Sequence, residues 1–120
     1  MLRYASELLE ANGIELHAEI APEAEQLKLN MKERHDVYLI FKEAINNIAR
    51  HSKAKIAQVK IYLVNNKFTM KINDDGKGFD ATASFINNGL KNMKERAQLH
   101  KWDLQLQSQN NIGTTILLNT

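Results

Sequence analysis

Residues 56–74, Ile-Ala-Gln-Val-Lys-Ile-Tyr-Leu-Val-Asn-Asn-Lys-Phe-Thr-Met-Lys-Ile-Asn-Asp, carry the strongest structural signal in the chain. Apolar and polar residues alternate on both sides of Asn65-Asn66, and several of the apolar residues are β-branched. Such alternation is typical of strands with one buried face, and Asn residues between two such runs favour a tight turn. The stretch therefore predicts a β-hairpin with strands at 56–64 and 67–74.

The segments on either side of this hairpin show helical and strand periodicities in turn. Asn30 and Glu33 have the spacing of a capping box that opens a long helix. Residues 75–88 have no apolar periodicity and are expected to form a loop. The complete prediction has helices at 2–11, 31–52 and 89–100, and strands at 14–20, 56–64, 67–74, 102–108 and 114–118.

This order of elements predicts the fold class. Helices combined with mostly antiparallel strands indicate an α+β fold, a two-layer α/β sandwich in which a mixed, mostly antiparallel sheet is covered on one face by three helices. The chain lacks the βαβαβ alternation of a doubly wound fold. At 120 residues it is long enough for one domain with a substantial core.

The bulk composition excludes several classes of function. A formal net charge of +2, with acids and bases interspersed, gives no indication of nucleic-acid binding. The chain has no cysteine, so it has no disulfide framework and no thiolate metal site, and it suits a reducing cytosol. The apolar runs are too short to span a membrane, and the first residues lack a signal-peptide pattern.

The second half of the long helix carries one candidate site. On a regular α-helix, Glu43, Asn47, Arg50 and His51 fall on one stripe. The amide of Asn47 suits Mg²⁺, which keeps much of its hydration and takes few protein ligands. Glu43, one turn earlier, could orient or deprotonate a nucleophile, and the two basic residues could meet phosphate oxygens. The alternative is an ordinary solvated helix face.

A second candidate follows the hairpin. Asp74 ends an apolar strand, and an ionised carboxylate only accepts hydrogen bonds, so it could bind the exocyclic amine of adenine but not the carbonyl of guanine. Gly76 and Gly78 would let the backbone approach the purine closely. The alternative is a plain Asp-Gly turn. The acidic pattern of a calcium loop and the Gly-Lys-Ser/Thr of a P-loop are both missing.

Two further pieces are weaker. Gly89-Leu90 precedes an amphipathic helix, whose first N–H groups suit a phosphate. Thr114 follows Gly113 at the start of the last strand, where its hydroxyl could bind adenine directly or through water. Each piece alone is also consistent with ordinary helix and hairpin structure.

In this order and spacing, the four pieces resemble the N box, G1 box, G2 box and Gly-Thr element of the GHKL ATPase superfamily. More narrowly, residues 14–120 resemble the catalytic domain of bacterial sensor histidine kinases whose response regulators carry helix-turn-helix domains. The resemblance implies an ATP lid at 80–88 and a role for each site residue: Asn47 as Mg²⁺ ligand, Glu43 as the acid/base residue acting on the accepting histidine, Arg50, His51, Gly89 and Leu90 near the phosphates, and Asp74, Gly76, Gly78 and Thr114 around adenine.

The resemblance also implies an activity and partners. Residues 1–13 would end a helix that connects to an upstream domain, and residues 14–120 would be the ATP-binding catalytic domain. The domain would bind Mg²⁺ and ATP and pass the γ-phosphate to a histidine of a separate dimerisation domain, and indirectly to a response regulator. Alone it is expected to be a monomer that transfers little phosphate, whereas the intact kinase is expected to be a cytoplasmic or membrane-anchored dimer.

Some residues depart from the pattern. Asn87 stands where the G2 box usually has a further glycine. No segment resembles a phosphoaccepting helix, since His35 lies on the N-box helix, and His17 and His100 are expected to be structural. Two other functions stay open: an anti-sigma-factor-type serine kinase, which shares the ATP-binding boxes, and a non-catalytic interaction module that responds to nucleotides.

Overall fold

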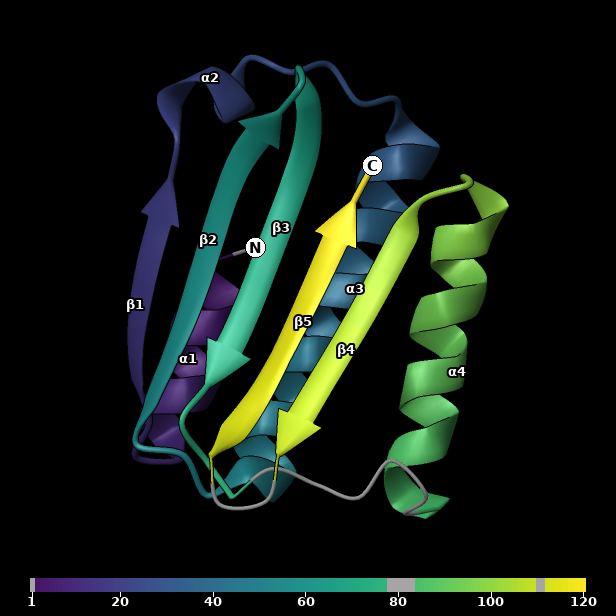
Figure 1. The fold of residues 1–120 in the computed structure, drawn as a ribbon. Helices are drawn as coiled ribbons and strands as arrows, with labels where there is room; N and C mark the ends of the chain where they lie inside the picture. Colours follow the sequence, from purple (N-terminus) through teal and green to yellow (C-terminus); the bar gives the residue numbers. More distant parts are fainter. Residues whose placement is uncertain (1, 78–83, 110–111) are drawn as a thin grey trace.

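The structure, a computed structural model, describes residues 2–77, 84–109 and 112–120, and only the backbone of 51, 52 and 84–88. Its elements form one layer of strands and one of helices (Figure 1). In chain order they are α1 (Leu2–Ala11), β1 (Glu15–Ile20), α2 (Pro22–Glu25), α3 (Met31–Asn47), the π-helical turn η1 (Ile48–Ser52), β2 (Ile56–Val64), β3 (Lys67–Asp74), α4 (Ser84–Leu99), β4 (Asp103–Gln109) and β5 (Gly113–Asn119).

The five strands form one sheet in the order β1-β2-β3-β5-β4. β1 pairs with β2 in parallel, and the other three pairs are antiparallel. The β2–β3 hairpin turns at Asn65 and Asn66, with φ of 53° and 63°. Asn tolerates such positive φ better than most residues, which is why two of them favour this turn. The predicted hairpin and the mixed, mostly antiparallel sheet are confirmed.

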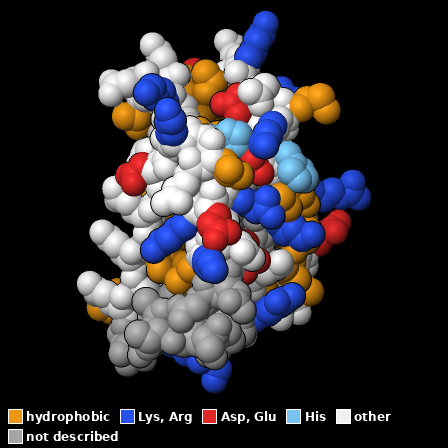
Figure 2. All heavy atoms as spheres, turned by 90° about the vertical axis from the view of Figure 1, so that its right-hand side faces the viewer, with side chains coloured by type: hydrophobic (Ala, Val, Ile, Leu, Met, Phe, Trp, Pro, Cys, Tyr) orange, Lys and Arg blue, Asp and Glu red, His pale blue; other side chains and the backbone are white. Residues whose placement is uncertain are grey.

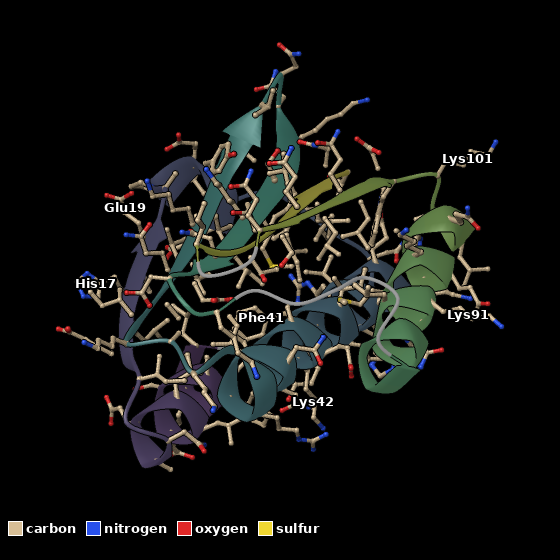
Figure 3. All side chains as sticks on the ribbon, turned by 60° about the horizontal axis from the view of Figure 1, so that its bottom comes forward. His17, Glu19, Phe41, Lys42, Lys91 and Lys101 are labelled. Atoms are coloured by element: carbon tan, nitrogen blue, oxygen red, sulfur yellow. The ribbon has the colours of Figure 1, made fainter. Side chains whose placement is uncertain are left out.

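The helical layer covers one face of the sheet, with α1 and α3 behind the strands and α4 along the β4 side (Figure 1). Neighbouring residues of α3 point in opposite directions: Phe41 lies beneath the sheet, and Lys42 points away from it (Figure 3). The predicted apolar stripe of α3 is fully buried and packs with inward-facing residues of the strands: Val37, Ile40, Phe41, Ala44, Ile45 and Ile48 with Val59, Met70, Ile72 and Leu118.

Capping and helix contacts fix the position of α3. The Asn30 side chain accepts from the Glu33 N–H at 2.8 Å, and Glu33 accepts from the Asn30 N–H at 3.0 Å, so the predicted capping box is confirmed. Residues Ala5 and Leu9 of α1 are buried in the same core. The Tyr4 hydroxyl donates to Asn46 Oδ1 at 2.5 Å and thereby joins α1 to α3.

The long helix ends near residue 52 as predicted, but its last turn is not α-helical; the start of α4 was predicted wrongly, and one short helix was not predicted. The long helix is α-helical only to Asn47, and its last turn widens to η1 before Lys53, whose φ of 53° ends it. α4 begins at Ser84 rather than 89, so part of the predicted loop and lid is helical, while 78–83 lie outside the described residues. The short helix α2 was not predicted, because Ala21-Pro22 was interpreted only as a strand terminator, although Pro is favoured in a first helical turn.

Candidate functional site

The candidate residues come together at one end of the molecule. α3 and β3 end there, and β5 and α4 begin there, at the bottom of Figure 1. Segments that are far apart in the sequence thus place Asn47, Asp74, Gly89 and Thr114 at the same edge of the two layers.

Asp74 is a buried acceptor at this edge. Its residue is 7% exposed, and its Oδ1 accepts a hydrogen bond from the Gly76 N–H at 2.8 Å. Burial raises the pKa of the Asp74 carboxyl; the Gly76 N–H opposes that shift, and the charge of Asp75 adds to it. The ionised form of the Asp74 carboxylate is therefore unfavourable in this buried position. Its oxygens can accept further hydrogen bonds.

The start of β5 lies directly against Asp74. Thr114 is 8% exposed and opposite Asp74 in the β3–β5 pairing, and its Oγ1 lies 3.0 Å from the Ser108 Oγ. A Cβ at Gly113 would come within 2.0 Å of the Asp74 carbonyl oxygen, and the φ of Gly113 is +133°. Only glycine fits both constraints. From the sequence, Gly113 was expected as part of a Gly-Thr element or as an ordinary hairpin glycine, and its close approach to Asp74 was not predicted.

Glu43 and Gly89 meet across the α3–α4 contact. A Cβ at Gly89 would lie 2.1 Å from Glu43 Oε1, so the α4 backbone passes directly against this carboxylate. The Glu43 side chain is half-buried. Leu90 turns its side chain into the core, at 7% exposed, so that side chain supports the helix rather than facing a ligand.

Asn47 ends the regular part of α3 with an unsatisfied amide. Its Nδ2 is buried and, among the residues that the structure describes, has no hydrogen-bond partner. A buried amide without a partner is unfavourable by about 1–3 kcal/mol, and such exceptions call for a ligand or a bound ion. Nδ2 is a hydrogen-bond donor, so an acceptor such as a phosphate oxygen would satisfy it, whereas the predicted contact with Mg²⁺ would be made by Oδ1 of the same amide.

The remaining predicted site residues are Arg50, Gly76, His51 and Gly78. Arg50 is exposed in η1, and the wider π-helical turn means that the α-helical spacing used to align it with Glu43 and Asn47 no longer applies. Gly76 is buried beside Asp74. The side chain of His51 and the whole of Gly78 lie outside the described residues.

A buried cluster at the other end of α4 had no signal in the sequence. Asp36 is 3% exposed, with Arg96 Nη1 at 3.4 Å and His100 Nε2 at 2.5 Å from its carboxylate oxygens. His100 stacks on Trp102 with ring centroids 4.2 Å apart, so the predicted structural role of His100 is confirmed. Burial raises the pKa of Asp36, but the bonds and charges of His100 and Arg96 outweigh it, and the pKa is lowered.

Two further properties bear on ligands and location. Within residues 2–77, 84–109 and 112–120, no group of three or more His, Cys, Asp or Glu side chains could hold a metal ion. In the same residues, no helix is both long and apolar enough to cross a membrane. The face of α4 carries Lys and Arg with acidic side chains among them (Figure 2).

Curated relatives of the chain are signalling kinases. It is 39% identical over 84 residues to "Signal transduction histidine-protein kinase/phosphatase DegS" of Brevibacillus brevis, covering 69% of this chain and 22% of the relative. It is 32% identical over 111 residues to "Sensor histidine kinase MctS" of Rhizobium johnstonii, covering 89% and 23%. The chain thus spans about a quarter of the length of these relatives.

Solved structures agree in fold. A histidine kinase domain from Erythrobacter litoralis superposes with a TM-score of 0.79 at 15% identity, covering 98% of this chain and 57% of that one. The histidine kinase AdeS of Acinetobacter baumannii gives 0.77 at 16%, covering 98% and 59%. The model of the family "Histidine kinase-, DNA gyrase B-, and HSP90-like ATPase" matches residues 32–120. The chain therefore belongs to the family of histidine kinase-, DNA gyrase B- and HSP90-like ATPases.

Proposed function

We propose that this chain is the Mg·ATP-binding catalytic domain of a sensor histidine kinase, and that it donates the γ-phosphate to a histidine on a separate domain. Membership of the ATPase family and the named kinase relatives support this proposal. The observation that carries it is Asp74, a buried carboxylate with a raised pKa at the end of β3.

Adenine is the proposed ligand of the Asp74 end. A buried acceptor-only group fits the exocyclic amine of adenine and repels the carbonyl of guanine. Gly113 brings β5 close to this position, so the Thr114 hydroxyl is available beside the base. Because these groups belong to the paired strands β3 and β5, they are held rigidly before any ligand arrives.

The phosphates are proposed to lie toward the end of α3. The Oδ1 of Asn47 would hold Mg²⁺ together with phosphate oxygens and waters, and the buried Nδ2 would donate to a phosphate oxygen. The metal would neutralise charge on the phosphates. Gly89 would allow the backbone of α4 to approach the phosphates, and Arg50 and His51 would add positive charge near them.

Glu43 is the proposed acid/base residue. It lies one turn before Asn47 on α3 and against Gly89. In the transfer step, a histidine ring nitrogen forms a bond to the γ-phosphorus while the bond to the β–γ bridging oxygen breaks and ADP leaves. Glu43 would hold or accept the proton of the other ring nitrogen and so keep the imidazole nucleophilic.

The accepting histidine is proposed to lie on a dimerisation domain of the parent protein, which in turn would phosphorylate a response regulator. The described histidines offer no suitable acceptor: His100 is paired with Asp36, His17 lies on the edge strand β1, and His35 lies near the start of α3, at the opposite end from Asn47. We expect the domain to be cytoplasmic and monomeric by itself.

The chemistry of the transferred phosphate tests this function. The parent protein, incubated with γ-labelled ATP and Mg²⁺, should acquire label that acid removes and base does not, which is the behaviour of phosphohistidine. Acid-stable label would identify a serine kinase instead. Binding of ATP with no label on any partner would favour a non-catalytic interaction module.

A further inference from the structure

Asp75, the residue after the proposed adenine ligand, makes hydrogen bonds that its exposure would not suggest. Its Oδ1 accepts from the Lys55 N–H at 2.9 Å and from the Ile56 N–H at 3.0 Å. Its own N–H donates to the Ile56 carbonyl at 3.2 Å. Asp75, the first residue after β3, is therefore joined to the start of β2 by both its side chain and its backbone N–H.

These bonds connect two parts of the site. Asp75 lies between Asp74 and Gly76, which are themselves bonded to each other at 2.8 Å. Lys55 lies at the end of the short segment that leaves α3 through η1 and the left-handed Lys53. The hydrogen bonds of Asp75 thus run from the turn at the Asp74 end to the segment that follows Asn47.

The chemistry at this position depends on geometry as well as charge. The Ile56 N–H, and after it the Lys55 N–H, lower the pKa of Asp75 against the smaller opposing effect of burial, so the carboxylate stays ionised at neutral pH. A neutral Asn has an oxygen at the same distance from the backbone and could accept the same two bonds. A Glu keeps the charge but places its oxygens one methylene farther out.

We propose that Asp75 is a positioning residue that sets the place of Asp74 relative to the chain leaving Asn47, and thereby aligns the adenine and phosphate ends of the nucleotide site. This inference rests on the proposed binding of Mg·ATP. An ordinary turn-stabilising role would affect folding alone, or all ligands equally. Loss of a positioning residue weakens the binding of a ligand that contacts both the adenine and the phosphate end of the site more than that of a ligand that contacts only one end.

The test compares Mg·ATP with adenosine by calorimetric titration of Asp75→Glu, Asp75→Asn and the unchanged chain. Asp75→Glu should weaken Mg·ATP about tenfold, the equivalent of one net hydrogen bond. The same variant should weaken the binding of adenosine less than about threefold, because Asp74, Gly76 and Thr114 keep their positions relative to one another. Asp75→Asn should bind Mg·ATP with an affinity within about threefold of that of the unchanged chain. Asp103→Glu, an exposed change on β4, is the matched control and should alter neither ligand.

Each other outcome is informative. If the unchanged chain binds neither ligand, the proposed function and this inference both fail. If the unchanged chain binds and Asp75→Glu binds Mg·ATP normally, or loses both ligands equally, the inference alone is overturned. If Asp75→Asn is as weak as Asp75→Glu, the position of the accepting oxygen does not by itself explain the loss, and the inference is again overturned. Should Asp75→Glu fail to fold, Asp75→Ser, whose hydroxyl is too short to reach both N–H groups, replaces it with the same expected ligand difference.

Discussion

Asp36 and Asp74 are both almost completely buried, yet the protein treats their charges in opposite ways. Asp36 has an imidazole and a guanidinium beside it, and its pKa is lowered despite burial. Asp74 accepts from one backbone N–H and lies near another carboxylate, and its pKa is raised, chiefly by burial. The Asp36 carboxylate has its partners within the fold, whereas the Asp74 carboxylate has capacity to accept a hydrogen bond from a ligand.

This difference separates structure from function within one small domain. A charge that is buried and paired fixes two elements together, here α3 with the end of α4. A charge that is buried with few partners lowers stability, and proteins keep such groups mainly at sites where a ligand completes them. The comparison therefore indicates a scaffold role for Asp36 and supports the binding role proposed for Asp74.

Glu43, on α3 against Gly89, should show the largest effect, and this effect should be on the chemical step alone. Glu43→Gln should slow phosphate transfer to the histidine domain by roughly 10²–10⁴-fold, the usual contribution of a general base. The affinity for Mg·ATP should change little, because Asn47 is the proposed metal ligand. Single-turnover transfer and calorimetry measure the two quantities separately. Loss of ATP binding with normal transfer per bound ATP would reverse this division of roles.

The Asp36 cluster should show the largest effect on stability. Asp36→Asn removes the negative charge beside His100 and Arg96, and should lower the free energy of unfolding by about 2 kcal/mol, less than for a fully buried pair because Arg96 is partly exposed. Urea denaturation measures this change. His35→Asn, at the exposed neighbouring position, is the control and should cost well under about 1 kcal/mol. Equal effects of the two changes would contradict a scaffold role for Asp36.

A smaller effect should appear in the pH dependence of stability, with opposite signs at the two aspartates. The stability that ionised Asp36 contributes is present above its ordinary pKa of 3.8 and is lost as pH falls through the lower folded value. Asp74 has a raised folded pKa, so its contribution is present below 3.8 and is lost as pH rises through the folded value. Hence Asp74→Asn should gain stability relative to the unchanged chain as pH rises, whereas Asp36→Asn should lose it.

Thermal unfolding of the three proteins from about pH 3 to pH 7 checks these slopes. Parallel curves for the two variants would show that the two carboxylates do not differ in the way their surroundings indicate.

Local sequence patterns predicted most of the fold because its elements follow local rules. The Asn65-Asn66 turn, the Asn30–Glu33 capping box and the apolar stripe of α3 each depend on neighbouring residues. Residues 84–88 show no apolar periodicity, so the early start of α4 could not be predicted from it, and no local pattern indicated the widened turn after Asn47.

The same distinction applies to the site. The motif residues Glu43, Asn47, Asp74, Gly89 and Thr114 were predicted from spacing and resemblance, and the structure places them at one end of the two layers. Their contacts could not be predicted. The pairing of Asp36 with His100 joins residues far apart in the sequence, and Gly113 is required by the approach of a carbonyl on another strand. The sequence indicated no more than a turn at Asp75, because its partners, the N–H groups of Lys55 and Ile56, lie 20 and 19 residues earlier in the chain.

Asp74 is the centre of this account, and nucleotide selectivity tests it most directly. Calorimetric titration with ATP and with GTP, both with Mg²⁺, should give ATP binding at least about tenfold tighter in the unchanged chain, a difference of about 1.4 kcal/mol. Asp74→Asn should weaken ATP by about 1–3 kcal/mol, as expected when a buried charge-assisted hydrogen bond is lost, without lowering the stability of the free domain. Equal affinity of the unchanged chain for ATP and GTP would contradict the role assigned to Asp74.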